Sequence, residues 1–418
     1  MTDTDSISTT YGAVRARSLE LCEPLAIEDY VVQPMDDASP PKWHLAHVTW
    51  FFETFLLKPY LDDYQPFHPD FEVLFNSYYN GVGEQFPRPR RGFLSRPTVA
   101  EIRDYRMYVD EAMQQLLARG ETPASAEVWY RTLLGCNHEQ QHQELMVTDL
   151  KYNLGNNPLY PAYTGAADET APEVAPLRFA GYEGGIHAIG VDLKPSVDRS
   201  FCFDNESPRH DVLLRDFSLA SRLVTNGEYL AFIEAGGYRE PSLWLSDGFS
   251  WLRQSGTEAP LYWVRRDGAW YEYTLAGLAP LDLSLPVCHV SGYEADAFAR
   301  WTGCRLPSEA EWEVAVSGSS TNGNFADLGR FHPAPAGGES QFFGDTWEWT
   351  SSSYGAYPGY RPLPGTLGEY NGKFMANQLV LRGGSCATPA DHIRPTYRNF
   401  FYPPDRWQFT GIRLAADA

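Results

Sequence analysis

The sequence of 418 residues contains few cysteines and no long apolar run. Its six cysteines never form a Cys-x-x-Cys pair, and this sparse usage is typical of a protein in a reducing cytoplasm. No stretch reaches the roughly 18 uninterrupted apolar residues of a membrane span, because the most hydrophobic one, residues 50–57, contains Glu53. The N-terminus, MTDTDSISTTYG, lacks the basic and then apolar segments of a signal peptide. We therefore expect a cytoplasmic protein without membrane spans.

Basic residues are also scarce, because 33 Lys and Arg stand against 54 Asp and Glu and give a formal net charge of -21. An acidic surface repels nucleic-acid phosphates and anionic lipids, so we expect neither nucleic-acid nor membrane partners. The hydrophobic content of 43% is typical of a globular chain. At roughly 150 residues per domain, the length allows two or three domains.

The first part of the chain, residues 1–154, has patterns typical of helices. Ser39, followed by two prolines, is expected to be an N-cap, and residues 98–101 form a capping box. We expect four helices, over residues 11–29, 40–57, 98–117 and 122–153, the last beginning at Thr122-Pro123. Four helices of this kind can pack as a four-helix bundle, so we predict a helical bundle for this part.

The second part of the chain differs from the first in its composition and its sequence patterns. Residues 155–176 are rich in Gly, Pro, Ala and acids without a sustained period, which predicts a linker. Residues 177–418 contain short β-like runs between many Gly, Pro and Trp residues, among them 211–214, 378–381 and 411–414. Capping boxes that begin at Thr225, Ser291 and Ser308 predict short helices there. The whole chain is therefore expected to be an α+β multidomain protein.

Three histidines are the clearest candidates for a functional site. His138 and His142 lie four residues apart on a predicted helix, so their imidazoles project from one face and can chelate one ion. His47 lies in the middle of another predicted helix among aromatic residues. A lone histidine there is more often a hydrogen-bonded core residue, but its presence together with the pair favours a metal. We therefore predict His47, His138 and His142 as ligands of one metal ion.

Two kinds of metal site fit these residues. His138-Glu139-x-x-His142 matches the zincin pattern, with Glu139 as the candidate base. A zincin needs a third ligand further along the chain, however, and residues 158–176 contain no histidine. Three neutral imidazoles leave open positions on the ion, which suits non-haem iron(II) that binds substrates and dioxygen together. The ion's full charge is then available to deprotonate a thiol, so Fe(II) is the expected cofactor.

These residues also carry a resemblance to a known family. Trp43-His-Leu-Ala-His47, with His138-x-x-x-His142-x-Glu144, resembles the DinB-like, iron-binding half of the sulfoxide synthases of ergothioneine biosynthesis. The second half resembles the formylglycine-generating-enzyme domain, a C-type-lectin-like α+β fold. The strings that carry this resemblance are CRLPSEAEWE (304–313), GDTWEW (344–349), LRGGS (381–385), RPTYRN (394–399) and TGIRL (410–414). Together they span nearly the whole chain.

The resemblance implies a reaction and roles for several residues. In this family iron(II) on three histidines binds hercynine (Nα-trimethylhistidine) and a thiolate, and dioxygen is used to form a C–S bond and oxidise the sulfur. Gln141 would bond the hercynine imidazole, and Asn399 would contact its amino-acid end. Many members continue after this asparagine with Trp-Asp, where this chain has Phe400-Phe401. Loss of that aspartate favours cysteine over γ-glutamylcysteine as the thiol substrate.

Further candidates follow from the chemistry. Tyrosine can donate a proton or an electron, which would steer the reaction away from plain thiol oxidation, and Tyr78 and Tyr79 lie between the ligand-bearing helices. Arg88 and Arg91 are candidates to bind the thiol substrate's carboxylate, with surface ion pairing as the alternative role. Phe400 and Phe401 are candidates for an aromatic wall around the trimethylammonium group.

Other functions stay open at this stage. An ovothiol-type synthase joins unmethylated histidine to cysteine with similar ligands, but that family usually carries a methyltransferase domain, and the sequence has no GxGxxG-like loop. A selenium-transferring relative is a further alternative. A non-catalytic lectin-like binding protein is the alternative from a different class, and the intact histidine set argues against it.

Overall fold

The computed structural model describes residues 3–119, 124–165, 174–192, 201–336 and 341–418. The chain divides into two compact units. The first comprises Met1–Asn156, Leu193–Phe203 and Pro362–Asn371, and the second comprises Asn157–Asp192, Asp204–Arg361 and Gly372–Ala418. A short segment from late in the sequence, Pro362–Asn371, thus belongs with the N-terminal helices. Part of the predicted linker, residues 166–173, lies outside the described residues.

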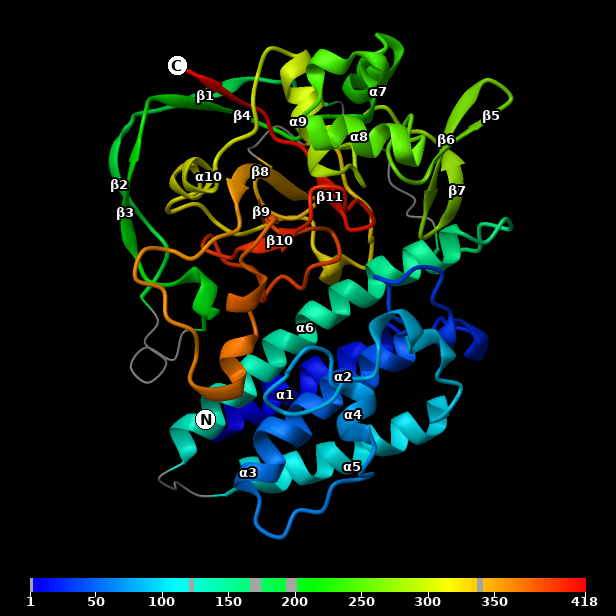
Figure 1. The fold of residues 1–418 in the computed structure, drawn as a ribbon, viewed down its shortest axis with the longest axis vertical. Helices are drawn as coiled ribbons and strands as arrows, with labels where there is room; N and C mark the ends of the chain where they lie inside the picture. Colours follow the sequence, from blue (N-terminus) through cyan, green and yellow to red (C-terminus); the bar gives the residue numbers. More distant parts are fainter. Residues whose placement is uncertain (1–2, 120–123, 166–173, 193–200, 337–340) are drawn as a thin grey trace. The chain divides into compact units, whose positions relative to one another are not determined.

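Helices dominate the first unit (Figure 1). The long helices are α1 (Asp3–Glu20), α2 (Pro41–Phe52), α5 (Val99–Leu117) and α6 (Ser125–Gly155). Shorter elements are a π turn (Glu53–Leu57), α3 (Lys58–Tyr60), α4 (Phe71–Phe75) and 3-10 turns at Ile27–Val31, Arg88–Phe93 and Gly365–Glu369. α2 packs against α5 and α6 and is buried along its whole length. It therefore forms the centre of the bundle.

The structure confirms the bundle and corrects its details. The first helix ends at Glu20 instead of residue 29, because Pro24 has no N–H to continue the ladder. Ser39 is not the N-cap of α2, since Pro40 holds that position. The capping box of α5 is present: Thr98 Oγ1 accepts the Glu101 N–H, and Glu101 accepts the Thr98 N–H at 2.7 Å. The predicted opening at Thr122-Pro123 lies outside the described residues.

In the second unit, the described residues form four small sheets. One is β1 (Phe179–Tyr182), β4 (Phe217–Ala220) and β12 (Ala415–Asp417), in the order β1-β4-β12. Another has the order β10-β9-β8-β11, with β8 Trp347–Ser353, β9 Leu379–Arg382, β10 Asn399–Phe401 and β11 Thr410–Gly411. β2 (Gly185–Ile189) pairs with β3 (His210–Leu214), and β5 (Trp263–Arg266), β6 (Ala269–Thr274) and β7 (Gly277–Pro280) form a meander. The helices are α7 (Asn226–Glu234), α8 (Ser246–Ser255), α9 (Gly292–Trp301) and α10 (Glu309–Ala315).

Most local predictions for the second unit are confirmed. The capping boxes at Thr225, Ser291 and Ser308 begin α7, α9 and α10. β3 and β9 lie within one residue of the predicted runs. The run 411–414 was expected to be one strand, which is wrong. β11 pairs with β8 and ends at Gly411, and the chain then crosses to a different sheet, where β12 pairs with β4.

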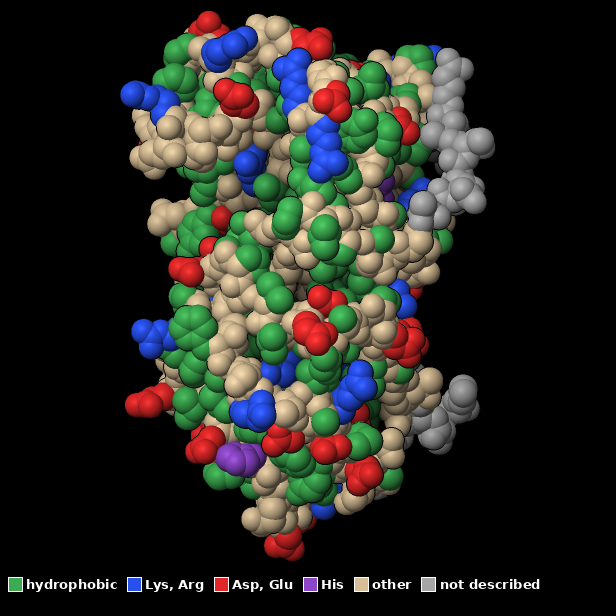
Figure 2. Space-filling view, turned by 90° about the vertical axis from the view of Figure 1, so that its right-hand side faces the viewer, with side chains coloured by type: hydrophobic (Ala, Val, Ile, Leu, Met, Phe, Trp, Pro, Cys, Tyr) green, Lys and Arg blue, Asp and Glu red, His purple; other side chains and the backbone are tan. Residues whose placement is uncertain are grey.

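Charged side chains of both signs are interspersed on the face drawn in Figure 2, where the described residues form no continuous patch of one sign. Among the described residues, no helix is both long enough and apolar enough to cross a bilayer.

Candidate metal centre

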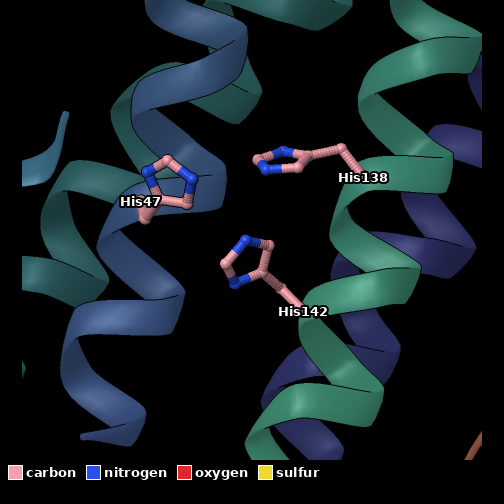
Figure 3. A group of neighbouring side chains, drawn as sticks. All are labelled: His47, His138 and His142. Carbon is pink, nitrogen blue, oxygen red and sulfur yellow. The ribbon is translucent and has the colours of Figure 1, made fainter. Parts of the chain in front are cut away.

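The three predicted ligands meet between α2 and α6 in the first unit (Figure 3). His47 projects from α2, and His138 and His142 project from successive turns of α6 toward it. One ring nitrogen from each histidine lies within 4.8 Å of those of the other two. His47 and His138 are fully buried, whereas His142 is partly exposed. Since all three come from rigid helices, the donor set is held in place before any ion binds.

The ring nitrogens of this cluster fit a metal ion. His47 Nδ1 lies 2.6 Å from the carbonyl oxygen of Phe75, so Nδ1 carries the proton and Nε2 presents a lone pair. His47 Nε2 and both ring nitrogens of His138 are buried without a hydrogen-bond partner among the described residues. An unpaired buried polar atom costs about 1–3 kcal/mol. A bound cation would satisfy His47 Nε2 and one of the two ring nitrogens of His138.

The protonation states also suit metal binding. Burial lowers the pKa of His138 to about 3. Burial, together with the neighbouring His138 ring, lowers the pKa of His47 well below its ordinary value, and the same two causes lower the pKa of His142. All three imidazoles are therefore neutral near pH 7, which is the form that ligates metals.

Glu139 lies in the same helix but is engaged elsewhere. One carboxylate oxygen accepts bonds from Ser18 at 2.6 Å and Arg106 at 2.9 Å, and the other accepts a bond from Arg15 at 2.9 Å. These partners lie on α1 and α5, and the carboxylate is fully buried among them. Glu139 is thus an anchor between helices, and the zincin alternative loses its base.

Known proteins match the chain over its whole length. Residues 10–146 match the DinB superfamily, and residues 182–334 and 320–418 match the sulfatase-modifying factor enzyme 1-like domain. A hercynine oxygenase of Mycolicibacterium thermoresistibile is 34% identical, with 91% of this chain and 87% of the relative covered. The chain belongs to the hercynine oxygenase family. Mycobacterium tuberculosis has a hercynine oxygenase that is 32% identical over all of both chains.

A further relative extends the comparison. Ergothioneine biosynthesis protein 1 of Schizosaccharomyces pombe is 32% identical over 51% of this chain and 27% of its own length. The matches to the DinB superfamily and the sulfatase-modifying factor domain confirm the predicted fold, a helical DinB-like part followed by an α+β domain of the formylglycine-generating-enzyme type. The family places the chain among oxygenases of ergothioneine biosynthesis.

In this member of the hercynine oxygenase family, two residues that the sequence analysis missed support His142. His44 Nδ1 lies 2.9 Å from His142 Nδ1, and His44 Nε2 lies 3.1 Å from Asp149 Oδ2. His44 stands three residues before His47, so it lies on a neighbouring part of the same helical face. That spacing was the signal available in the sequence.

The tyrosine pair lies in a loop after α4. Tyr79 is buried, and its ring contacts those of Tyr78, Trp50 and Phe55 at centroid distances of 4.6–5.7 Å. Burial raises the pKa of Tyr79 well above its ordinary value. Asn76 holds the loop, because its side chain bonds both the N–H and the carbonyl of Tyr79 at 3.0 Å.

Another tyrosine reaches the histidines from the late segment of the first unit. The ring of Tyr370 lies 5.6 Å from that of His138, and its hydroxyl donates to Gln141 Oε1. Glu369 accepts the backbone N–H groups of Asn80 and Gly81 at 3.0 and 2.7 Å. The segment thus ties the tyrosine-bearing loop to α6. No local pattern in the sequence pointed to Tyr370.

The predicted arginines differ in their surroundings. Arg88 is about half exposed and bonds the carbonyl oxygen of Asp37. Arg91 is buried: its guanidinium lies 3.3 Å from the centroid of the Trp43 ring and donates to the hydroxyls of Ser39 and Ser77. Trp43 stacks in turn on His47 with ring centroids 4.7 Å apart. Arg91 therefore supports the ring that backs a predicted ligand.

The remaining predicted residues belong to the second unit. Asn399, Phe400 and Phe401 form β10, which pairs with β9. Phe400 stacks on Tyr354 at a centroid distance of 4.0 Å, and Phe401 contacts Trp407. The Asn399 side chain accepts the N–H of Phe400 at 2.9 Å. All three residues are partly exposed.

Proposed function

We propose that this chain is an iron(II)- and dioxygen-dependent sulfoxide synthase that joins hercynine to cysteine, with γ-glutamylcysteine as the second candidate thiol. One observation carries the proposal: three imidazoles converge, and ring nitrogens of two of them, His47 and His138, are buried with no hydrogen-bond partner among the described residues. A site with few protein ligands leaves room on the ion for substrates. The names of the relatives support hercynine as the substrate and ergothioneine biosynthesis as the process.

The overall reaction balances without a further reductant. A C–H bond of the hercynine imidazole and the S–H bond of the thiol break, and a C–S bond and an S–O bond form. These changes release four electrons, which reduce dioxygen, with one oxygen atom leaving as water. Bound on His47, His138 and His142, ferrous iron would supply the one-electron chemistry with dioxygen and acidify the thiol.

The protein's own groups have the remaining tasks. We assign to Gln141 the hydrogen bond to the hercynine imidazole, since it lies beside His142 on α6. A tyrosine hydroxyl supplies a proton, and the candidates are Tyr78, Tyr79 and Tyr370, of which Tyr370 contacts the ring of His138. Proton delivery at this point favours the sulfoxide over sulfinic acid.

Substrate-binding roles for other residues rest on the resemblance. Arg88 is the candidate for the carboxylate of the thiol, because its guanidinium is accessible. Arg91 has both terminal nitrogens engaged and keeps only Nε for a ligand. Asn399, Phe400 and Phe401 are candidates for the amino-acid end and the trimethylammonium group of hercynine. The six cysteines, all within the described residues, form no disulfide bond, which suits the cytoplasm that we propose as the compartment.

The test is a product assay with the full chain. Iron-loaded protein is incubated with hercynine and oxygen plus either cysteine or γ-glutamylcysteine, and products are identified by mass spectrometry. We expect the sulfoxide, formed faster with cysteine. A product from histidine but not from hercynine would instead indicate an ovothiol-type synthase. Substrate binding without turnover would indicate a binding protein.

A further inference from the structure

A chain of three buried polar groups leads away from one proposed ligand. His142 Nδ1 lies 2.9 Å from His44 Nδ1, and His44 Nε2 lies 3.1 Å from Asp149 Oδ2. The same carboxylate oxygen accepts the backbone N–H of Ser39 at 2.7 Å. His44 and Asp149 are both 3% exposed, and all four residues lie in the first unit. Side chains of this kind are costly to bury unless their hydrogen bonds are complete.

Donor and acceptor rules fix the direction of this chain. An ionised carboxylate only accepts hydrogen bonds, so His44 Nε2 must be the donor to Asp149. A neutral imidazole that is protonated at Nε2 has a lone pair at Nδ1. His44 Nδ1 therefore accepts, and His142 Nδ1 donates. His142 is then left with its lone pair on Nε2, the nitrogen remote from His44.

A different hydrogen-bond acceptor fixes the same tautomer of His47. There the Phe75 carbonyl accepts from Nδ1 and leaves the lone pair on Nε2. Two ligands on different helices are thus held in one tautomer by two unrelated acceptors, one a backbone carbonyl and one a histidine. Partners of this kind orient a metal-binding imidazole and make it more basic.

We propose that His44 and Asp149 are positioning residues that hold His142 in the tautomer with Nε2 available to a metal ion. The inference rests on the metal site of the proposed function. It gives a role to two residues outside the ligand set. It also explains why a histidine and a carboxylate are buried where α2 and α6 meet, although apolar residues of similar size would pack there without any need for partners.

Two amide variants provide a matched test. In His44→Asn the side-chain oxygen lies near the position of Nδ1 and can accept from His142. In His44→Gln the amide reaches toward Asp149 and leaves the His142 N–H without an acceptor. Both variants are polar and similar in size, so packing alone does not distinguish them. His44→Leu removes both contacts.

The readout is cobalt(II) binding to the metal-free full-length protein, followed by its visible absorption spectrum. We expect His44→Gln and His44→Leu to bind cobalt about 10–100-fold more weakly than wild type, with altered spectra. His44→Asn should keep the wild-type spectrum and recover most of the affinity. Circular dichroism of each metal-free variant identifies any that does not fold, and the Asn and Gln pair carries the test if the Leu variant fails.

The possible failures are distinguishable. If the folded His44→Gln and His44→Asn variants both bind cobalt like wild type, with the same spectrum, the positioning role is wrong. If His44 is instead a ligand, the Asn variant also loses affinity and its spectrum changes, which likewise overturns the inference. If wild type does not bind cobalt, the metal site of the proposed function is itself wrong.

Discussion

The hydroxyl of Tyr370 donates a hydrogen bond to the side-chain oxygen of Gln141, a residue 229 positions earlier in the chain. This bond fixes the segment Pro362–Asn371 to α6 within the first unit. It also directs the Tyr370 ring against the ring of His138. The ring of Phe203 stacks on the ring of Tyr370, with the two centroids 5.5 Å apart. A tyrosine and an amide are thereby positioned next to the proposed metal ligands before substrate arrives.

The first prediction concerns the partition between two products. Tyr370→Phe removes one hydroxyl and keeps the ring, so turnover should shift from the sulfoxide toward cysteine sulfinic acid, because the proton donor is lost. The ratio of the two products is measured by mass spectrometry. Tyr78→Phe and Tyr79→Phe are the matched variants. If one of them shifts the ratio while Tyr370→Phe does not, the donor is in the loop after α4.

Tyr370 also marks the limit of prediction from sequence. The pair His138 and His142 was accessible because a helix repeats every 3.6 residues, and a capping box such as that of Thr98 is equally local. The partners of Ser39 could not be foreseen in the same way, since Arg91 and Asp149 reach it only through packing. Tyr370 joins the histidines through a tertiary contact across most of the chain, which no periodicity encodes.

Gln141 gives the second prediction, which separates substrate binding from metal binding. Gln141→Leu removes the amide proposed to bond the hercynine imidazole, and one such bond is worth about 1 kcal/mol. The KM for hercynine should therefore rise roughly tenfold at most, while cobalt affinity stays at the wild-type level. Steady-state kinetics and metal titration measure the two effects. Weaker metal binding with unchanged KM would show that Gln141 supports the ligands instead.

The third prediction is that metal binding stabilises the first unit. His47 Nε2 and one ring nitrogen of His138 gain a partner in the metal-bound state. An ion at 100 times its dissociation constant adds about 2.7 kcal/mol to the free energy of unfolding. Thermal unfolding with iron(II) under anaerobic conditions should therefore occur at a higher temperature than with a chelator. His138→Ala is the control, and its midpoint should not respond to the ion.

Glu139 provides the fourth prediction, about the anchor behind the ligands. Burial alone would raise its pKa, but Arg15 and Arg106 outweigh burial and lower the pKa to about 2. Glu139→Gln leaves the buried Arg106 without a counter-charge and Arg15 with Asp110 alone, so the free energy of unfolding should fall by about 3–5 kcal/mol. Chemical denaturation measures this loss. The fraction that stays folded should still bind cobalt, whereas a catalytic base would show an activity loss without loss of stability.

The last prediction concerns the pH dependence of the second unit. Glu309 bonds Arg398 at 2.8 Å and Arg382 at 3.0 Å. Burial would raise the pKa of Glu309, but these guanidiniums hold it below its ordinary value of 4.5. Its ionised form is therefore favoured by folding. The stabilisation is complete above about pH 4.5 and is lost as the pH falls through the lower pKa of the folded state.

Glu309→Gln should consequently destabilise the protein by about 3–5 kcal/mol at neutral pH, because the buried Arg398 loses its carboxylate partner and the buried Arg382 keeps only Glu313. The difference from wild type should shrink below pH 4.5, where the carboxylate of unfolded wild-type chains becomes protonated while the folded one stays ionised to lower pH. Urea unfolding between neutral and acidic pH measures this, with the exposed Glu234→Gln as the matched control. A difference that stays constant across the series would mean that Glu309 does not titrate with unfolding, and the ion pairs would then contribute through packing and not through charge.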